Sequence, residues 1–388
     1  MGEGWGGGLS SFISVDDHVQ EHPTVWTDRL PKARWDDRVP HVERQKDGTE
    51  RWIVDGKQLP LTGVAVAGAL QADRTVEPRR WEEVPKGAYQ PRERLEAMDA
   101  AGIACSVLYP TVAGFAGEAF ARLDDPDLEL ACVQAYNDWL IDEWAAASPR
   151  FVAQCIVPTY SAEAATAEIR RAVGRGHRGV VFPPLPMMVR DVPHINEPEY
   201  ETIWSACQEL DVPVCFHAGS VPSLQLPPHA SLDPAVADGL RAVTSGAATV
   251  YTVSNLLFSK ILVRHPRLHV VIAESALGLS TYTWEFADHE YEHDRVYLDA
   301  EYPLKPSELF KRQCFYTSWY DPVASVIPFV PASNIMWAAN LPLSTSTWPD
   351  CQEFIGRSFA GLGDADRQRI LWTNAAELYR IEDTHPVG

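Results

Sequence analysis

Short apolar runs alternate with longer amphipathic segments along the chain from residue 91 onward. The segment 92–101, RERLEAMDAA, has apolar residues at helical spacing and is followed by Gly102, a residue type that often ends helices. The next run, ACSVLY at 104–109, is apolar and is stopped by Pro110. This pair of patterns recurs to the end of the chain, and it predicts buried parallel strands connected by helices.

Eight strands are expected. The first begins at Phe12, and the others span 104–109, 151–157, 179–182, 213–217, 269–273, 314–319 and 335–340. Helices are expected over 92–101, 124–147, 162–175, 198–210, 234–264, 277–295, 306–312, 351–361 and 365–379. Eight such units indicate an α/β fold of the (β/α)8 TIM-barrel type, with its active site at the carboxyl ends of the strands. An open doubly wound sheet is the alternative, but it usually has a glycine-rich turn after the first strand, where this chain reads DDHVQE.

The segment 23–90 has no long hydrophobic period and is rich in tryptophan, proline, glycine and charge. It contains one strand pair, 51–54 and 58–61, around the turn residues Asp55 and Gly56. We therefore expect a single barrel domain over 1–388, with an inserted loop and small β segment over 23–90 after the first strand. An insertion of this length commonly has a function such as covering a site.

Composition and charge exclude several classes of function. The net charge of −20 and the lack of a basic block argue against nucleic acid and anionic membranes as partners. No apolar run reaches the roughly 18 residues of a membrane span, and the amino-terminal MGEGWGGGLS does not resemble a secretory signal. The seven cysteines form no C-x-x-C pair, which indicates buried free thiols in a reducing compartment. We expect a cytoplasmic protein whose partner is a small-molecule substrate.

Polar and titratable groups gather at the carboxyl ends of the expected strands. Asp16 and His18 are two positions apart on the first strand, so their side chains point to the same face. The fifth strand ends on His217, the sixth is followed by Glu274, and the eighth ends on Asn340. In a barrel these positions meet at one mouth. There Asp16, His18 and His217 could hold a metal ion or act as acid and base.

Six short segments, distributed between residues 12 and 349, carry a family resemblance. They are FISVDDHVQEHPTVW at 12–26, PKGAYQPRERLEAMDAAGI at 85–103, YNDWL at 136–140, PVCFHAG at 213–219, RHPRLHVVIAESALG at 264–278 and NIMWAANLPLSTSTWP at 334–349. With these segments the chain resembles the amidohydrolase-related branch of the amidohydrolase superfamily. That branch includes the aminocarboxymuconate-semialdehyde decarboxylase-like and resorcylate decarboxylase-like enzymes. The resemblance implies a (β/α)8 barrel, one divalent metal ion, zinc or manganese, and a homodimer.

The resemblance also implies roles for individual residues. Asp16 and His18 stand at the metal-binding positions of strand 1, and His217 stands at the metal-binding position of strand 5. Glu274 stands where decarboxylase relatives have a catalytic histidine, and this branch often has an acid there. Glu274 is therefore expected to move a proton during catalysis, and a structural ion pair with a nearby basic residue is the alternative.

The chain departs from the family after strand 8. The family motif reads roughly G-[ST]-D-Y-P-H, whereas this chain reads AANLPL at 338–343 between matching flanks. Asn340 thus replaces the acid, and Leu343 replaces the histidine. Asn adds no charge and accepts no proton, so we expect weaker metal binding and no water-activating base at this position. Asn340 then acts as a weak carbonyl ligand or a substrate hydrogen-bond partner, and Leu343 forms an apolar wall for the substrate.

Three further residues are candidates for substrate contact. His194 and His229 follow the fourth and fifth strands, and Trp319 ends the seventh strand. A surface position is the alternative for both histidines. His289 and His293 have a helical spacing that can bind metal, but the surrounding sequence DHEYEHDR predicts a solvated helix face.

Three functions remain open from the sequence. The first is a non-oxidative decarboxylase, or a related hydrolase, acting on a small carboxylated aromatic or cyclic substrate with a divalent ion. Decarboxylation is favoured over hydrolysis because it needs no activated water. The second is a metal-independent enzyme that catalyses cyclisation, elimination, condensation or isomerisation in a specialised biosynthetic pathway, with the same strand-end residues as acid and base. The third is a non-catalytic binding barrel, which the retained groups of strands 1 and 5 argue against.

Overall fold

The computed structural model of the chain describes residues 11–59, 61, 63–74, 76–221, 236, 239–240, 243–244 and 246–382. Its parallel strands form two sheets, one in the order β1-β5-β6 and the other in the order β12-β11-β10-β9-β8-β7. These strands are β1 (Phe12–His18), β5 (Ile103–Tyr109), β6 (Phe151–Ala153), β7 (Cys155–Ile156), β8 (Val180–Val181), β9 (Val214–His217), β10 (Val270–Ala273), β11 (Cys314–Ser318) and β12 (Ile335–Trp337).

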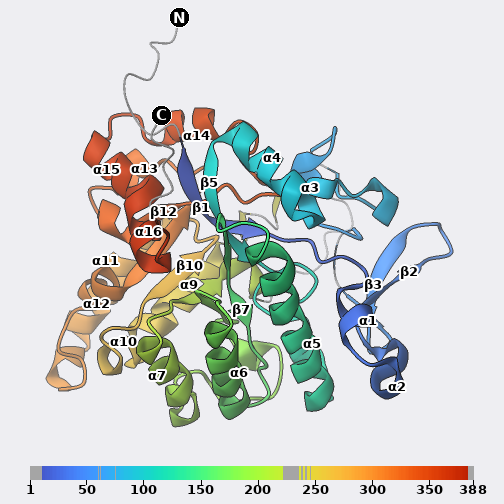
Figure 1. Cartoon of the computed structure of the whole chain (residues 1–388). Helices are drawn as coiled ribbons and strands as arrows, with labels where there is room; N and C mark the ends of the chain where they lie inside the picture. Colours follow the sequence, from blue (N-terminus) through green and yellow to red (C-terminus); the bar gives the residue numbers. More distant parts are fainter. Residues whose placement is uncertain are drawn as a thin grey trace, which may run out of the picture.

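The two sheets are joined at both ends. β6 and β7 are separated only by Gln154, so together they occupy the third strand position. At the other end, the Asn340 N–H donates to the Asp16 carbonyl over 3.0 Å, and the His18 N–H donates to the Leu341 carbonyl over 2.7 Å. With β6 and β7 counted as one, eight parallel strand positions run through the core with helices outside them (Figure 1). The predicted (β/α)8 TIM-barrel class is confirmed.

The third strand differs from the continuous strand expected over 151–157. Gln154 divides this strand position into β6, which pairs with β5, and β7, which pairs with β8. The buried Gln154 side chain donates to the Leu108 carbonyl of β5 over 3.4 Å and accepts from the Cys215 thiol of β9 over 2.8 Å. The strand therefore breaks where the chain passes between the sheets, and a buried amide connects strands on both sides.

Helices occur at the predicted positions, with some different ends. Asp125 caps α5 and Ser161 caps α6 by accepting backbone N–H groups. α5 continues as a π-helix over Leu140–Ala145, and part of the helix expected over 234–264 lies outside the described residues. The helices are α4 (Pro91–Ala101), α5 (Pro126–Trp139), α6 (Ala162–Gly174), α7 (Glu201–Glu209), α9 (Ala247–Leu257), α10 (Ile261–Arg264), α11 (Leu279–His293), α12 (Pro306–Gln313), α13 (Val323–Val326), α14 (Cys351–Ser358), α15 (Asp364–Gln368) and α16 (Asn374–Tyr379).

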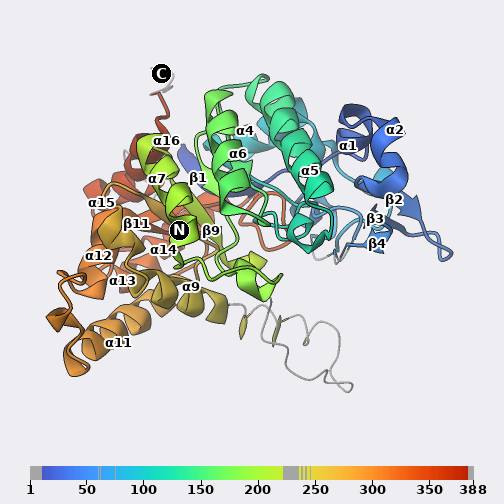
Figure 2. The ribbon, with the colours of Figure 1, turned by 90° about the horizontal axis from the view of Figure 1, so that it is seen from below.

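The inserted segment forms a lobe at one side of the barrel, near α5 (Figures 1 and 2). Trp26 Nε1 donates to the Cys132 carbonyl of α5 over 2.9 Å and so fixes the lobe to the barrel. The predicted hairpin is present around Asp55 and Gly56, but its second strand, β4, is Lys57–Gln58 where 58–61 was expected. One further strand, β2, was not predicted because its residues are exposed or half-buried and lack an apolar run. The lobe contains α1 (Val25–Arg29), α2 (Lys32–Trp35) and the antiparallel strands β2 (His41–Arg44), β3 (Glu50–Val54) and β4 (Lys57–Gln58), whereas α3 (Lys86–Tyr89), also in the insertion, lies beside α4 (Figure 1).

Another part of the insertion packs against the segment after β12. The Ala69 N–H donates to the Pro342 carbonyl over 3.1 Å. Gly68 approaches Ser344 so closely that a Cβ at Gly68 would lie 2.8 Å from the Ser344 side chain. The insertion therefore contacts the segment in which the chain departs from the family motif.

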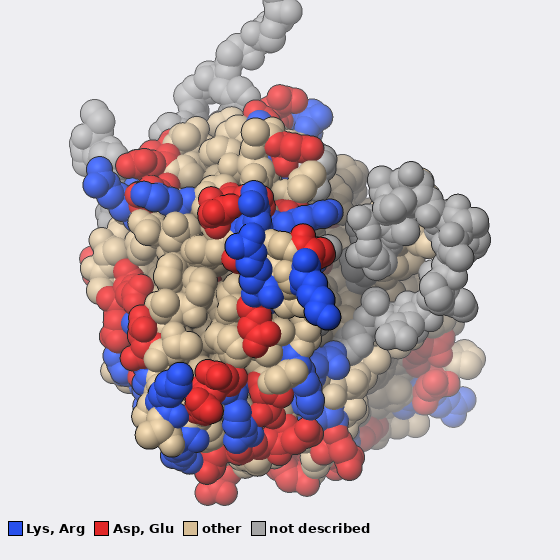
Figure 3. All heavy atoms as spheres, turned by 90° about the vertical axis from the view of Figure 1, so that its right-hand side faces the viewer, with Lys and Arg blue, Asp and Glu red and all other residues tan. Residues whose placement is uncertain are grey.

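The state of the cysteines and the distribution of surface charge agree with the expectations from composition (Figure 3). All seven cysteines are buried free thiols, as predicted. On the face shown in Figure 3, basic side chains lie next to acidic ones. In the described part of the chain, no helix combines the length and the apolar character that crossing a bilayer requires. The cytoplasmic location and the homodimer stay predictions.

Candidate active site and metal centre

The carboxyl end of β1 brings Asp16 and His18 together inside the barrel. The strand is buried at every position, and Asp16 Oδ1 lies 3.6 Å from His18 Nε2. His217, the last residue of β9, has its Nε2 3.5 Å from the same Asp16 oxygen. The potential ligand atoms of these three buried residues all lie within 4.8 Å of one another. The structure therefore unites the groups predicted at strands 1 and 5.

Four buried polar atoms in and beside this group have no hydrogen-bond partner among the described residues. They are Asp16 Oδ1, His18 Nε2, His217 Nε2 and Asn340 Oδ1. Each unpaired buried polar atom costs roughly 1–3 kcal/mol, so several in one place indicate a missing ligand. Carboxylate oxygen, imidazole nitrogen and amide oxygen all bind divalent cations such as zinc or manganese. The donor set therefore fits a divalent metal ion.

Burial sets the charge of this group. It raises the pKa of Asp16 to about 6, although His18 and the Glu274 N–H counteract part of the rise. It lowers the pKa of His18 to about 4, and the nearby His217 adds to this effect. Burial also lowers the pKa of His217. At neutral pH Asp16 is therefore mostly ionised and both imidazoles are neutral, which gives the group one negative charge.

The two imidazoles are held in different tautomers. His18 Nδ1 lies 2.9 Å from the Pro110 carbonyl, which can only accept, so Nδ1 carries the proton and Nε2 presents a lone pair. His217 Nδ1 instead accepts the Gly219 N–H over 3.1 Å, which places the proton of neutral His217 on Nε2. A cation at Nε2 would require this proton to be on Nδ1 instead, and Nδ1 would then no longer accept the Gly219 N–H. There Glu274 Oε2, at 3.7 Å, is the nearby acceptor.

Glu274 follows β10 in the left-handed conformation, with φ 53°. Its backbone N–H donates to Asp16 Oδ2 over 3.1 Å and to Thr317 Oγ1 over 3.0 Å, which anchors the turn to the site. Its side chain is 21% exposed, whereas that of His217 is 0% exposed. Burial nevertheless raises the pKa of Glu274. A partly accessible carboxyl group with a raised pKa is suited to donating a proton.

Asn340 follows β12 and also has a left-handed backbone, with φ 58°, which Asn tolerates better than most residues. Its Nδ2 donates to Thr345 Oγ1 over 3.1 Å, and this bond assigns the unpaired atom as Oδ1. Leu343 is 7% exposed, and its N–H donates to the Asn340 carbonyl over 3.1 Å. The segment after β12 thus presents a neutral oxygen and a buried apolar side chain.

Two of the other predicted contact residues, His194 and Trp319, are not members of the Asp16 group. His194 is half-buried in the loop after β8, where its Nδ1 accepts the Asn196 N–H over 3.3 Å. Trp319 is buried directly after β11 and packs edge-to-face with Tyr320 at 4.8 Å. His229 lies outside the described residues. Substrate contact by these three residues stays a prediction.

Two residues at the site were not predicted from the sequence. Phe115, in the loop after β5, has its ring centroid 4.5 Å from that of His18 and 5.1 Å from that of His217. Thr345 orients the Asn340 amide. Phe115 belongs to no motif or periodic pattern, whereas Thr345 lies within the family-like segment 334–349 but has no feature there that marks it as a site residue. The glycines in AGFAGE around Phe115 are the one sequence feature that indicates a tight turn there.

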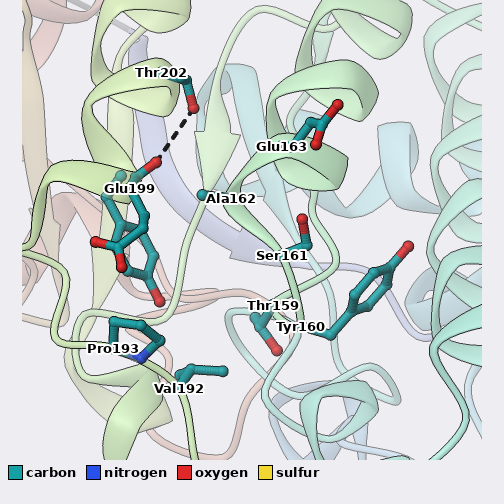
Figure 4. Close-up of a pocket in the computed structure, with 10 residues that line it drawn as sticks. Thr159, Tyr160, Ser161, Ala162, Glu163, Val192, Pro193, Glu199 and Thr202 are labelled. Carbon is teal, nitrogen blue, oxygen red and sulfur yellow. Dashed lines mark hydrogen bonds between the residues drawn. The ribbon is translucent and has the colours of Figure 1, made fainter.

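A separate pocket of about 360 Å³ lies between the start of α6 and the segment before α7 (Figure 4). It contains none of the predicted site residues and none of the buried unpaired polar atoms found among the described residues. Thr202 Oγ1, for example, donates to the Glu199 carbonyl over 3.4 Å. Because the pocket shares no residue with the group Asp16, His18 and His217, the two are distinct sites. Its lining consists of Thr159, Tyr160, Ser161, Ala162, Glu163, Val192, Pro193, Glu199, Tyr200 and Thr202.

The barrel and the ligand-type residues at its strand ends define a TIM-barrel enzyme with a candidate metal centre. The chain belongs to the amidohydrolase family, whose sequence profile matches residues 42–381. The predicted superfamily and enzyme class are confirmed. The match begins after β1, so the assignment of Asp16 and His18 to the site rests on their geometry.

Known relatives include decarboxylases. The chain is 25% identical over 315 residues to gamma-resorcylate decarboxylase of Rhizobium sp. (strain MTP-10005), which covers 74% of this chain and 86% of the relative. An amidohydrolase from Mycobacterium avium subsp. paratuberculosis K-10 superimposes with a TM-score of 0.74 at 21% identity, over 95% of this chain and 99% of that protein.

A third similar protein was solved with a metal. It is 5-carboxyvanillate decarboxylase from Novosphingobium aromaticivorans DSM 12444, with bound manganese and 3-methoxy-4-hydroxy-5-nitrobenzoic acid, in an Asp-to-Asn mutant. The TM-score is 0.64 at 17% identity, over 96% of this chain and 99% of that protein. At such identities the similarity to both solved structures establishes the fold alone.

Proposed function

We propose that this protein is a divalent-metal-dependent, non-oxidative decarboxylase of a small, hydroxylated aromatic carboxylate. The observation that carries the proposal is the set of unpaired buried donor atoms on Asp16, His18, His217 and Asn340. The names of the relatives support it, because gamma-resorcylate decarboxylase and 5-carboxyvanillate decarboxylase both act on substrates of this class.

Asp16, His18 and His217 would hold the ion, and Asn340 Oδ1 would be a neutral fourth donor. When bound, the ion supplies Lewis-acid polarisation of substrate oxygen atoms. With one ionised ligand, a dication leaves the site with a net charge of about +1, which attracts an anionic substrate. The site is thus suited to a carboxylate.

Glu274 is the proposed proton donor. Burial raises the pKa of its carboxyl group, and its side chain is partly exposed. The Glu274 proton passes to the ring carbon that bears the carboxylate, and the bond between this carbon and the carboxylate then breaks. The electron pair of that bond restores the aromatic ring, CO2 leaves, and the Glu274 carboxylate regains a proton from solvent. One proton enters and one CO2 leaves, so no activated water is needed and an amide at position 340 is tolerated.

Metal analysis combined with CO2 release tests this function. Protein purified without chelators is expected to contain zinc or manganese and to release CO2 from 2,6-dihydroxybenzoate or 5-carboxyvanillate. Chelation should abolish turnover, and addition of manganese should restore it. Less than about 0.2 ion per chain, with turnover unaffected by chelation, would contradict the metal-dependent reaction.

A metal-independent lyase or isomerase is the second candidate, and the tautomer of His217 favours it. Because Nδ1 accepts the Gly219 N–H, His217 Nε2 carries a proton beside Asp16. This arrangement suits acid catalysis without an ion. Turnover that survives chelation but is lost in His217→Ala would select this candidate.

A further inference from the structure

Phe115 covers the two site histidines. The planes of its ring and the His18 ring make an angle of 56°, with centroids 4.5 Å apart, and the corresponding values for His217 are 47° and 5.1 Å. Both imidazoles are fully buried, whereas Phe115 is half-buried. The phenyl ring therefore contacts both histidines, and Phe115, in a loop at the carboxyl ends of the strands, is less buried than the imidazoles that it covers.

The loop that carries Phe115 is held by Glu118. The Glu118 carboxylate accepts the Phe115 N–H over 3.1 Å and the Ala116 N–H over 2.8 Å. Gly114 has φ +85°, and a Cβ there would lie 2.4 Å from the Glu118 carboxyl carbon. The carboxylate thus fills the inside of the turn. Its bonds to two successive N–H groups fix the backbone from which the phenyl ring projects.

Phe115 also borders the proposed proton donor. A Cβ at Gly219 would lie 2.9 Å from Phe115 Cδ2, 2.6 Å from Glu274 Oε2 and 3.1 Å from His217 Cε1. The phenyl ring, the acid and the imidazole therefore meet around one glycine. A substrate group that lies against this ring gains aromatic and dispersion contacts but no hydrogen bond.

We propose that Phe115 is the specificity-determining residue of this site. Its ring packs against the aromatic ring of the substrate and turns the carboxylate-bearing carbon toward Glu274, and Glu118 is the positioning residue. The inference rests on the proposed function and deepens it, because it assigns recognition of the substrate ring to one side chain. A saturated acid of the same charge has no flat π face and gains less from this contact.

Binding of two probes of equal charge to the manganese-supplemented protein tests the role of Phe115. The probes are benzoate, which lacks the hydroxyl groups of the proposed substrates, and cyclohexanecarboxylate, and calorimetry gives the ratio of their dissociation constants. Phe115→Ala is expected to reduce the preference for the aromatic probe about three- to tenfold. Phe115→Tyr keeps the ring and should hold the wild-type ratio within about twofold. Phe354→Ala is the matched control, because Phe354 is also half-buried but lies on α14.

Glu118→Gln tests the positioning role. The amide keeps the size of the side chain but replaces one acceptor oxygen with a donor that faces backbone N–H groups. We expect the preference to change in the same direction as in Phe115→Ala, by about two- to threefold, with unchanged metal content. A merely destabilising substitution would weaken both probes equally and leave the ratio unchanged.

An unchanged ratio in Phe115→Ala would overturn the proposal, as would wild-type protein that binds neither probe. These outcomes are separable from failure of the decarboxylase function, which is measured by CO2 release and metal analysis. Protein that discriminates the probes through Phe115 but releases no CO2 would retain this inference and reject the decarboxylase. CO2 release with no effect of Phe115→Ala on the ratio would retain the decarboxylase and reject the role of Phe115.

Discussion

Two groups of ligand-type residues occur in the described part of the chain, and their surroundings differ. The buried group consists of Asp16, His18 and His217, and the α11 group consists of Glu290, His293 and Asp294. Both bring potential ligand atoms within 4.8 Å of one another. The buried group has unpaired atoms and almost no exposure. In the α11 group, His293 Nδ1 lies 3.1 Å from Asp294 Oδ1, and these side chains are 68% and 65% exposed.

Ligand types and spacing therefore do not identify a metal site by themselves. The segment HEYEH at 289–293 even has the H-E-x-x-H spacing of zinc proteases, yet the exposed side chains of the α11 group can be satisfied by water. In the buried group water is excluded, so the free atoms require a ligand. The predictions below test this difference, beginning with the largest expected effect.

His217→Ala is expected to remove the metal ion. Loss of one of the two proposed imidazole ligands should reduce bound metal more than about tenfold and turnover more than about hundredfold. Elemental analysis and CO2 release measure both effects. His293→Ala is the matched control and should leave both unchanged. Loss of metal in the control, or full metal content in His217→Ala, would contradict the assignment of the metal to the buried group.

Asn340→Asp is expected to tighten metal binding about tenfold. A second carboxylate neutralises the charge that remains on the bound dication, and competition with a fluorescent chelator measures the affinity. Asn196→Asp, at a half-buried asparagine in the loop after β8, should not change it. Equal affinities of wild type and Asn340→Asp would show that the oxygen at position 340 is not a ligand.

Metal affinity is expected to depend on the charge of Asp16. Its pKa is about 6, so the carboxylate is lost as the pH falls below 6, whereas His18, with a pKa of about 4, does not compete for protons until lower pH. Affinity should therefore be nearly constant above pH 7 and fall about tenfold per unit between about pH 6 and 4.5. Asp16→Asn should lower the affinity and remove this slope. A fall that already begins above pH 7 would contradict the assignment.

Glu290→Gln is expected to have the smallest effect. A half-buried residue of the α11 group should change the melting temperature by less than about 1 °C and leave metal content unchanged. Chelation of the wild-type protein should lower the melting temperature by several degrees, because the ion binds only the folded state. Differential scanning fluorimetry measures both. A larger shift for Glu290→Gln than for chelation would place the structural metal on α11.

The buried group could be predicted because its signals are local. The alternation of apolar runs and helices indicates the barrel, and strand ends then place Asp16, His18, His217 and Glu274 at one mouth. The replacement of the family acid by Asn340 can also be read directly from the sequence. The barrel and its strand-end groups follow from the spacing of residues along the sequence. The missing acid follows from comparison of 338–343 with the family motif.

Other features exist only in the folded chain. The Gly219 N–H donates to His217 in the loop after β9, and Phe115 packs against the histidines from the loop after β5. Both contacts depend on the conformations of these loops. The free Asn340 oxygen depends on a left-handed backbone and on Thr345. The sequence by itself thus determined the barrel, the identity of the strand-end groups and the missing acid. The tertiary structure alone decided which atoms stay unpaired and which side chain covers them, because hydrogen-bond direction and loop conformation depend on contacts between distant segments.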